Sequence, residues 1–315
     1  MKTKLKSSSR VAWHSCGVST ICAGALLLAS SSMLAQNIFV SDYFSGNIYQ
    51  YTPGGTRSTF ATGLADPFGL AFDSAGNLFE ADGNELPVPK GSIYEFTPGG
   101  TRSTFASGLV TPYGLAFDSA GNLFVSDNGT GTYNIYKYTP GGVRTTFATG
   151  LNTPTGLAFD SAGNLFEADG NSGHIYEFTS GGVRTTFASG LNTPFGLAFN
   201  SAGILFEADE VSGNIYEFTP GGVRTTFASG LSSPLGLAFD SAGNLFETDY
   251  GSGNVYKFAP DGTRSTFATG LQNPLAVAVQ GVTLPVPEPS TLGLLAVGVA
   301  AFLAHRRRCG AKTRT

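Results

Sequence analysis

The sequence predicts an all-β protein: a six-bladed β-propeller whose blades are four-stranded antiparallel sheets. Three observations support this fold class. The 315 residues include 43 Gly, 16 Pro and 25 Phe, but only 13% are charged and two are Met, a balance that favours short strands joined by turns over helices. A motif Pro-x-Gly-Leu-Ala-Phe recurs along the chain. Each repeat contains four β-like runs, which is the pattern of a propeller blade.

The repeat is marked by its proline. The spacings between successive prolines are 45, 42, 40, 40 and 40 residues, so the unit has 40 residues and the first two copies carry small insertions. The prolines are Pro67, Pro112, Pro154, Pro194 and Pro234, and a decayed copy begins at Pro274.

One unit, residues 194–231, illustrates the four predicted strands. Short apolar or alternating runs cover residues 196–200, 205–209, 215–219 and 223–228. Ser-Ala-Gly and Pro-Gly-Gly segments between them are typical turn sequences.

The two ends of the repeat region predict how the ring closes. Five complete units run from residue 67 to residue 271, residues 38–64 supply only the second to fourth strands, and residues 274–280 supply only a first strand. We therefore predict a sixth blade shared between the two ends, which removes exposed sheet edges. A glycine two residues after each proline suits inner strands that converge on a narrow axis, and only Ala276 departs from it: Gly69, Gly114, Gly156, Gly196 and Gly236.

The N-terminus, residues 1–36, has the order of a secretory signal peptide. Four basic residues precede an apolar stretch at about residues 18–29, and small residues follow up to Ala35. We expect the mature chain to begin near Gln36. Two alternatives are a lipoprotein signal using Cys22, although this residue lies inside the apolar stretch, and an uncleaved anchor helix.

The C-terminus, residues 282–315, has three parts. Pro287, Glu288 and Pro289 precede residues 291–304, an apolar or weakly polar run of about 21 Å as a helix, which is short of a ~30 Å hydrocarbon core. Three arginines follow, Arg306 to Arg308. A simple one-pass tail anchor is the alternative reading of this segment.

This order resembles the PEP-CTERM sorting signal. The resemblance implies recognition by an exosortase, a membrane protease and transpeptidase of Gram-negative bacteria that make exopolysaccharide. It further implies transit across the inner membrane, transient membrane insertion of the C-terminal helix, and removal of the tail near Pro287. The protein would then reside at the cell surface or in the extracellular matrix.

Charge and residue usage exclude several functions for residues 37–281. That region has nine basic and 21 acidic residues, so nucleic acid is an unsuitable partner. All three cysteines lie outside it, which excludes a disulfide or a thiolate metal site there. Its one histidine, His174, occupies a slot that is asparagine in four other units, and we interpret it as a surface substitution.

Within each unit, Asp-Ser-Ala-Gly-Asn-Leu-Phe, then Ala-Asp, then Ser-Gly-Asn-Ile-Tyr resembles the NHL repeat. The likeness covers residues 37–281. The NHL family shares the six-bladed arrangement with gluconolactonase-like proteins and more loosely resembles the streptogramin lyases. This resemblance implies a fold and leaves function open, because the superfamily holds enzymes, ligand binders and scaffolds.

One aspartate ends the second predicted strand of every unit. A ring of six carboxylates could bind Ca²⁺ or a cationic ligand. Because the residue repeats in every unit, we favour the alternative that each caps the following loop by accepting backbone N–H groups. The six are Asp42, Asp82, Asp127, Asp169, Asp209 and Asp249.

Four units carry a glutamate two residues before this aspartate, where the other two have Val40 and Val125. We expect these glutamates to be partly buried or to face the central channel. They are either structural, with the six outer-strand arginines as chemically suitable partners, or an acidic channel that could hold one divalent cation such as calcium. The weak metal-ligand candidates are Glu80, Glu167, Glu207 and Glu247.

Variation between units is concentrated in the loops of one face. Between the second and third strands, the first unit carries an insertion with Glu85 and Lys90, and the second unit carries Tyr133. The residue after each proline also varies, and variable loops on a rigid repeat are where binding usually occurs. The candidate binding residues are Glu85, Lys90, Tyr113, Tyr133, Phe68 and Phe195, with Tyr43, Phe44 and Tyr250 as further aromatic surface.

The sequence therefore predicts a secreted or surface-attached, non-catalytic propeller without a cofactor. It would bind an extracellular polysaccharide or protein through its loop face. The alternative is a metal-dependent gluconolactonase-like hydrolase or a streptogramin-lyase-like enzyme, for which a unique histidine or an asymmetric set of acids and amides would be the expected signal.

Overall fold

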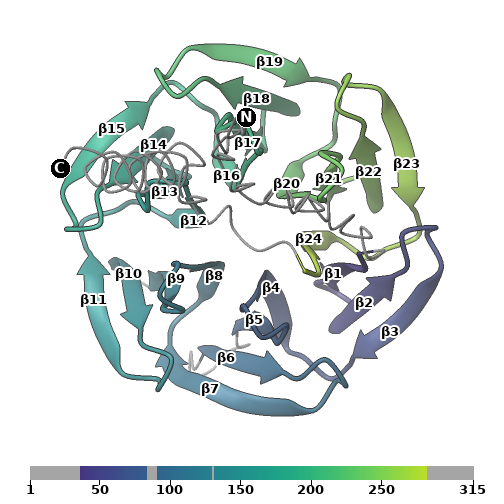
Figure 1. Ribbon diagram of the computed structural model, residues 1–315, viewed down its shortest axis with the longest axis horizontal. Helices are drawn as coiled ribbons and strands as arrows, with labels where there is room; N and C mark the ends of the chain where they lie inside the picture. Colours follow the sequence, from purple (N-terminus) through teal and green to yellow (C-terminus); the bar gives the residue numbers. More distant parts are fainter. Residues whose placement is uncertain (1–35, 84–90, 130, 282–315) are drawn as a thin grey trace, which may run out of the picture. The chain divides into compact units, whose positions relative to one another are not determined.

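The computed structural model describes residues 36–83, 91–129 and 131–281, which form six four-stranded antiparallel sheets around a central channel (Figure 1). The predicted fold class is confirmed. The candidates Glu85 and Lys90, the predicted signal peptide up to Ala35 and the C-terminal segment from Val282 lie outside the described residues.

The five complete units are blades 1 to 5. Blade 1 is β4 (Asp66–Phe72), β5 (Leu78–Gly83), β6 (Gly91–Phe96) and β7 (Arg102–Leu109). Blade 2 is β8 (Pro112–Phe117), β9 (Leu123–Gly129), β10 (Thr132–Tyr138) and β11 (Arg144–Ala148). Blade 3 is β12 (Pro154–Phe159), β13 (Leu165–Asp169), β14 (His174–Phe178) and β15 (Arg184–Ala188). Blade 4 is β16 (Pro194–Phe199), β17 (Leu205–Asp209), β18 (Asn214–Phe218) and β19 (Arg224–Ala228). Blade 5 is β20 (Pro234–Phe239), β21 (Leu245–Asp249), β22 (Asn254–Phe258) and β23 (Arg264–Ala268).

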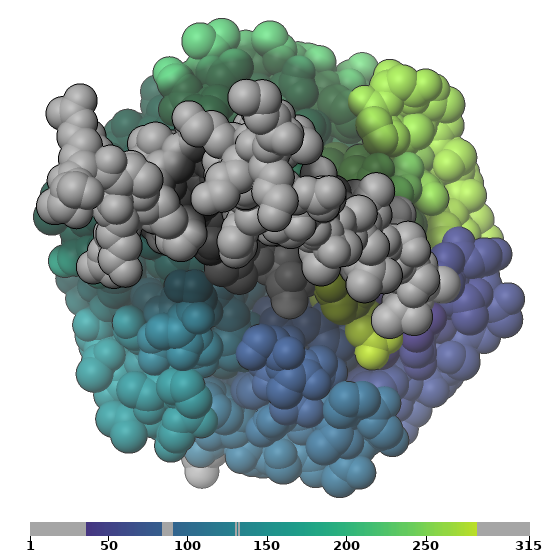
Figure 2. Space-filling view, in the orientation of Figure 1, coloured from purple at the N-terminus to yellow at the C-terminus, as the bar shows by residue number. Residues whose placement is uncertain are grey.

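Blade 6 joins the two ends of the repeat region, as the sequence predicts. Its strand order is β24 (Pro274–Val279), β1 (Ile38–Asp42), β2 (Asn47–Tyr51) and β3 (Arg57–Ala61). β24 runs antiparallel to β1, with Ile38 opposite Val279. Figure 2 shows the yellow residues of β24 beside the purple N-terminal strands. The closing strand therefore completes a sheet that would otherwise present the edge of β1.

In five of the six blades the inner strands approach each other so closely that only glycine fits after the variable residue; blade 6 has Ala276 there. A methyl group at Gly196 would collide with the carbonyl oxygen of Leu235 in the next blade. The same conflict recurs around the ring. Beside this glycine the pairing of β16 with β17 shifts register between Pro194 and Leu197, so a bulge lies at the channel.

The hydrophobic core lies between adjacent blades. Phe166 of blade 3 packs edge-on against Phe187 and Phe199, with ring centroids 5.0 Å apart in both pairs. The same cluster contains Leu197 and Phe218 of blade 4. Five of the six interfaces contain the same edge-on phenylalanine pair between blades, and Val279 takes the place of the second phenylalanine between blades 5 and 6. The repeat therefore stabilises the ring through similar aromatic contacts.

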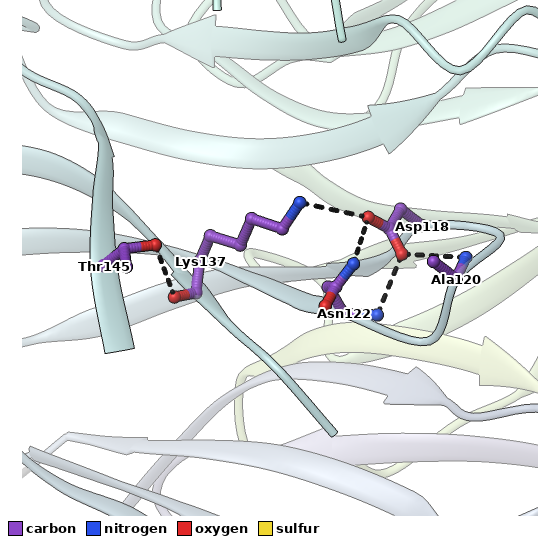
Figure 3. A network of polar contacts seen from close by, with 5 residues as sticks. All are labelled: Asp118, Ala120, Asn122, Lys137 and Thr145. Atoms are coloured by element: carbon purple, nitrogen blue, oxygen red, sulfur yellow. Dashed lines mark hydrogen bonds and ion pairs between the residues drawn. The ribbon is translucent and has the colours of Figure 1, made fainter. Parts of the chain in front are cut away.

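The turn from the first to the second strand is held by a repeated aspartate. Asp118 Oδ1 accepts hydrogen bonds from the backbone N–H groups of Ala120 and Asn122, at 3.0 and 2.8 Å (Figure 3). Its Oδ2 accepts one from Asn122 Nδ2 at 2.7 Å and lies 3.6 Å from Lys137 Nζ. Thr145 Oγ1 donates to the Lys137 carbonyl, which joins the third and fourth strands at the same place. This network explains the Asp-Ser-Ala-Gly-Asn motif as turn chemistry.

The outer-strand arginines stack on tyrosines of the neighbouring third strand. Arg224 lies 4.9 Å from the centre of the Tyr216 ring, and its Nη1 donates to the carbonyl of Gly190 in the preceding blade. The other five arginines make the same stacking contact at 4.9 to 5.2 Å: Arg57, Arg102, Arg144, Arg184 and Arg264. These six arginines therefore stabilise the outer edge of the propeller, and none of them forms an ion pair with a buried glutamate.

Candidate functional site

A cavity lies on the channel axis. Its volume is about 590 Å³, including the space at its opening. Leucine or valine side chains from equivalent positions of all six inner strands line it: Leu70, Leu115, Leu157, Leu197, Leu237 and Val277. The wall is thus apolar, and its chemistry varies only where the inner strands begin.

The residue after each blade's proline forms a set that we call the inner ring. Its members are Phe68, Tyr113, Thr155, Phe195, Leu235 and Leu275, in blade order. The aromatic members contact one another. Phe68 and Tyr113 stack with ring centroids 4.3 Å apart, and Tyr113 meets Phe195 edge-on at 5.9 Å. Phe68, Tyr113 and Phe195 therefore form a row of contacting rings, which we call the aromatic arc, on one side of an otherwise repeated ring.

Thr155 explains why Tyr113 and Phe195 meet although a blade separates them. Thr155 is buried, and its hydroxyl donates to the carbonyls of Ala168 and Pro194 at 2.9 and 3.0 Å. A side chain this short leaves room above blade 3, where the two aromatic rings close the gap.

The residue after each strand-ending aspartate forms a second set, the rim. Its members are Tyr43, Gly83, Asn128, Gly170, Glu210 and Tyr250. A methyl group at Gly83 would collide with the ring of Phe68, and one at Gly170 would contact the Thr155 methyl group. A side chain at this position is thus directed toward the inner ring, and that of Tyr43 in blade 6 reaches Phe68 of the neighbouring blade 1. We call the inner ring and the rim together the channel mouth.

Glu210 is the one acidic residue of the rim. It occupies the position that Gly83 holds beside Phe68 in blade 1, and its backbone N–H donates to Thr193 O at 3.1 Å. Among the described residues its carboxylate has no hydrogen-bond or ion-pair partner, and partial burial raises its pKa above the ordinary value. Sequence reasoning missed this residue. The available signal was a single acid at a position that elsewhere holds Tyr, Gly or Asn.

Tyr113 lies where the groups of the mouth converge. Burial raises the pKa of its phenol to about 12, and smaller contributions come from Tyr43, Glu210, Asp66 and Tyr250. These four residues belong to four other blades. Tyr113 lines the cavity and, with this raised pKa, presents a neutral phenol there.

The structure brings three of the sequence-predicted binding residues together, namely Phe68, Tyr113 and Phe195. Tyr43 extends the arc at 5.6 Å from Phe68, and the adjacent Phe44 is 67% exposed. Tyr133 lies elsewhere. It packs half-buried against a hydrophobic cluster formed by blades 2 and 3, so its aromatic ring serves packing and does not join the arc.

The ring of aspartates caps loops, which was the favoured interpretation. Asp209 accepts backbone N–H bonds from Asn192 at 2.7 Å and Ser212 at 3.1 Å. Asp82 similarly receives the N–H groups of Ala65 and Asp66. All six aspartates are almost fully buried. Their oxygens thus accept backbone N–H groups of the loops on either side of the second strand, except that Asp42 Oδ1 has no hydrogen-bond partner among the described residues.

The four glutamates lie between blades and do not line the channel. Glu80, Glu167, Glu207 and Glu247 are each 0% exposed, and neither carboxyl oxygen of any of them has a hydrogen-bond partner. Burial raises the pKa of all four well above the ordinary value; the neighbouring aspartate adds repulsion and the blade's arginine offsets part of it. Their burial favours the structural alternative over the acidic channel, because the strand register directs this side chain into the interface.

A compensating exchange explains the two valines. The two blades that have a valine at this position, blade 6 with Val40 and blade 2 with Val125, have a tyrosine at the end of the third strand, Tyr51 and Tyr138. The four blades that have a glutamate have a phenylalanine at the end of the third strand: Phe96, Phe178, Phe218 and Phe258. The Tyr51 hydroxyl and the Glu80 carboxyl both interact with their own blade's aspartate and arginine. Each blade thus keeps one buried polar group at the same place, which is a structural pattern.

Within residues 36–83, 91–129 and 131–281, no three His, Cys, Asp or Glu side chains gather as metal ligands would. His174 stacks on Tyr176 with ring centroids 5.5 Å apart. In the equivalent places Asn47, Asn134, Asn214 and Asn254 donate to the corresponding tyrosine hydroxyl. This position therefore belongs to the outer part of the blade.

Outside the ring, residues 285–308 match the PEP-CTERM protein-sorting motif. The chain carries a PEP-CTERM sorting signal. The signal indicates export and exosortase-dependent sorting to the surface of a Gram-negative bacterium. The matched residues include Pro287, Glu288 and Pro289, on which the sequence-based resemblance rested.

The ring is similar to several solved propellers. A chain of the nidogen/laminin complex is 24% identical, with a TM-score of 0.69 over 78% of this chain and 98% of its own. A gluconolactonase from Xanthomonas campestris is 20% identical, with a TM-score of 0.61 over 68% and 79%. A streptogramin B lyase is 16% identical, with a TM-score of 0.60 over 76% and 82%. At these identities the similarity establishes the fold alone.

A comparison with curated protein sequences gives no match for this PEP-CTERM chain. In the part of the chain that the structure describes, no helix is long and apolar enough to span a membrane.

Proposed function

We propose that this protein is a non-catalytic binding module of the bacterial surface or extracellular matrix, and that its partner binds at the channel mouth. One observation carries the proposal: Phe68, Tyr113 and Phe195 form an asymmetric aromatic arc on an otherwise repeated ring. Rigid aromatic side chains at the opening of a preformed cavity supply binding energy at low conformational cost.

The positions of the carboxylates favour binding over catalysis. The aspartates accept backbone hydrogen bonds, and the glutamates are enclosed between blades. A general base or a metal ligand needs a side chain that reaches the substrate. At the mouth, aromatic rings surround a single half-buried acid, Glu210, a composition that suits recognition.

The sorting signal supports the location. We propose that the signal peptide ending near residue 36 and the Pro-Glu-Pro segment act in sequence, so that the propeller reaches the outside after an exosortase processes the tail. Replacing Pro287, Glu288 and Pro289 by alanine should leave an unprocessed, membrane-retained chain in a native-like host. An unchanged mature mass and location would contradict this route.

The binding proposal is tested with a paired variant, Tyr113→Ala with Phe195→Ala. Exopolysaccharide and matrix protein are isolated from the producing bacterium, and each fraction is measured separately for binding to the protein. Loss of one or two aromatic anchors should weaken binding to one fraction by at least tenfold. Val223→Ala serves as the control, because Val223 is an exposed residue in an outer turn of blade 4. Equal binding by the paired variant and the control would refute the proposal.

A further inference from the structure

We propose that the channel mouth takes the guanidinium group of an arginine side chain, presented by an extracellular protein partner. This inference rests on the proposed function and specifies its ligand. It starts from the charge of the mouth. Glu210 places a partly buried carboxylate at the rim, in the position that Gly83 holds beside Phe68 in blade 1, within electrostatic range of Tyr113, and no described residue pairs with it.

The described cations lie elsewhere in the blades. Two lysines, Lys137 and Lys257, occupy third strands, and the arginines occupy fourth strands. None of these belongs to the inner ring or the rim, so the described part of the mouth has one acidic residue, Glu210, and no basic residue. Residues 37–281 also contain 21 acidic against nine basic residues, which favours the approach of a cationic partner.

The aromatic arc suits a cation that is flat. Tyr113 and Phe195 meet with an interplanar angle of 70°, so their rings form a corner in the same mouth whose rim holds Glu210. Aromatic faces attract cations, and a guanidinium can stack on a ring while its edge donates two parallel N–H bonds to a carboxylate. An ammonium group is a compact charge and cannot stack in this way.

This protein already uses the same contact in its own structure. Each of its six blades stacks an arginine over a tyrosine ring, at 4.9 to 5.2 Å. In four of those pairs the guanidinium also donates to a backbone carbonyl, as Arg184 does to Gly150. At the mouth the ring and the acceptor are present, as Tyr113 and Glu210, and the described residues supply no arginine.

Three five-residue peptides test the proposal on the full-length chain: Gly-Gly-Arg-Gly-Gly, its lysine form and its citrulline form. Binding is measured by NMR titration at low ionic strength. The arginine peptide should bind, the lysine peptide several-fold more weakly, and the neutral citrulline peptide not measurably. Citrulline keeps the planar shape without the charge, so equal binding of arginine and citrulline would overturn the inference.

The matched variants are Glu210→Gln and Glu217→Gln. Both remove one acid from blade 4, but Glu217 lies on β18 and accepts a hydrogen bond from Thr225 on the outer strand. Glu210→Gln should weaken binding of the arginine peptide by about tenfold or more, as loss of a charge-assisted hydrogen bond does. Glu217→Gln should weaken it by less than twofold. Equal affinities in the two variants would overturn the inference.

The outcome also separates this inference from the proposed function. If Tyr113→Ala with Phe195→Ala abolishes binding of a matrix fraction while Glu210→Gln leaves it intact, the mouth is a binding site but its ligand is not an arginine. If the paired variant retains full binding, the mouth itself is excluded and the proposed function fails.

Discussion

Two neighbouring positions on each inner strand behave in opposite ways. Phe195 belongs to the inner ring, whose members are Phe, Tyr, Thr, Phe, Leu and Leu, whereas the next residue, Gly196, is glycine in five of the six blades. A side chain at Gly196 would strike the carbonyl of Leu235, while the residue before it opens onto the cavity. Contact with the backbone of another blade restricts the position of Gly196 to a small residue. The position of Phe195 faces the cavity, and its side chain can vary between blades.

The second strand repeats this contrast at its end. Asp209 holds the loop before β16 through backbone N–H bonds and is the same residue in all blades. Glu210, one residue later, reaches the mouth and differs in every blade except for the repeated Gly and Tyr. The propeller thus combines an invariant frame, formed by the positions of Gly196 and Asp209, with a variable mouth. Changes to the frame should affect folding, and changes to the mouth should affect binding.

Deleting residues 273–281 should have the largest effect. The deletion removes β24, so β1 loses its inner partner and the ring opens. We expect loss of cooperative unfolding or a fall of many degrees in the melting temperature, measured by circular dichroism. A truncated chain that melts at the wild-type temperature would contradict the shared sixth blade.

Gly196→Ala should destabilise the protein by about 2 to 4 kcal/mol, because the added methyl group collides with a backbone oxygen that cannot move alone. The control is Gly221→Ala, where the nearest atom to a new methyl group is 3.9 Å away. Denaturant unfolding should show little change for the control. Equal losses of unfolding free energy in both variants would contradict the role of the close contact between inner strands.

The variant Glu207→Gln should be more stable than the wild type, by an amount that increases as the pH rises. Burial raises the carboxyl pKa of Glu207 well above 4.5, so the folded state favours the neutral form. Below the unfolded-state pKa both states are protonated and the variant should match wild type. Above it the unfolded chain ionises first, and the wild type loses stability until the pH passes the folded-state pKa.

At pH 8 the glutamine variant should therefore be more stable, by on the order of 1 to 3 kcal/mol. Unfolding measured from pH 4 to pH 8 checks this, and a constant difference between variant and wild type would contradict it. Glu210→Gln serves as the comparison. This carboxyl is only half-buried, so its substitution should change the pH profile less.

Tyr113→Ala should have the smallest effect on stability, about 1 kcal/mol. Its ring stacks on Phe68 and is half-buried, but it does not belong to any of the clusters between blades. Thermal unfolding measures the loss. A loss as large as that of Gly196→Ala would place Tyr113 in the frame.

The sequence was sufficient for the frame because the frame is what repeats. The proline spacing predicted six blades and the shared one, and the repetition of the aspartate predicted its capping role. The spacing of the repeats could not predict where the side chain of Glu207 lies, because this depends on the strand register. Glu207 lies on β17, whose two faces pack against the blades on either side: Leu205 belongs to the cluster with blade 3, and Phe206 to the cluster with blade 5. Because side chains alternate along the strand, Glu207 lies on the same side as Leu205 and enters an interface between blades.

The mouth was predicted in part. Phe68, Tyr113 and Phe195 stood out because they vary at a fixed place in the repeat. Tyr133 also varies, but its position on β10 directs it into the packing between blades 2 and 3. Glu210 was missed because its loop has the ordinary length, and its relation to Phe195 depends on how β17 returns beside β16.

The separation of frame and mouth is tested most directly by measuring two quantities on one protein, Tyr113→Ala with Phe195→Ala. The first is its unfolding free energy, and the second is its affinity for the matrix fraction that the wild type binds. The account predicts a stability within about 2 kcal/mol of wild type and an affinity at least tenfold weaker. A variant that keeps its affinity, or loses it only together with its fold, would contradict the claim that the channel mouth is the binding site.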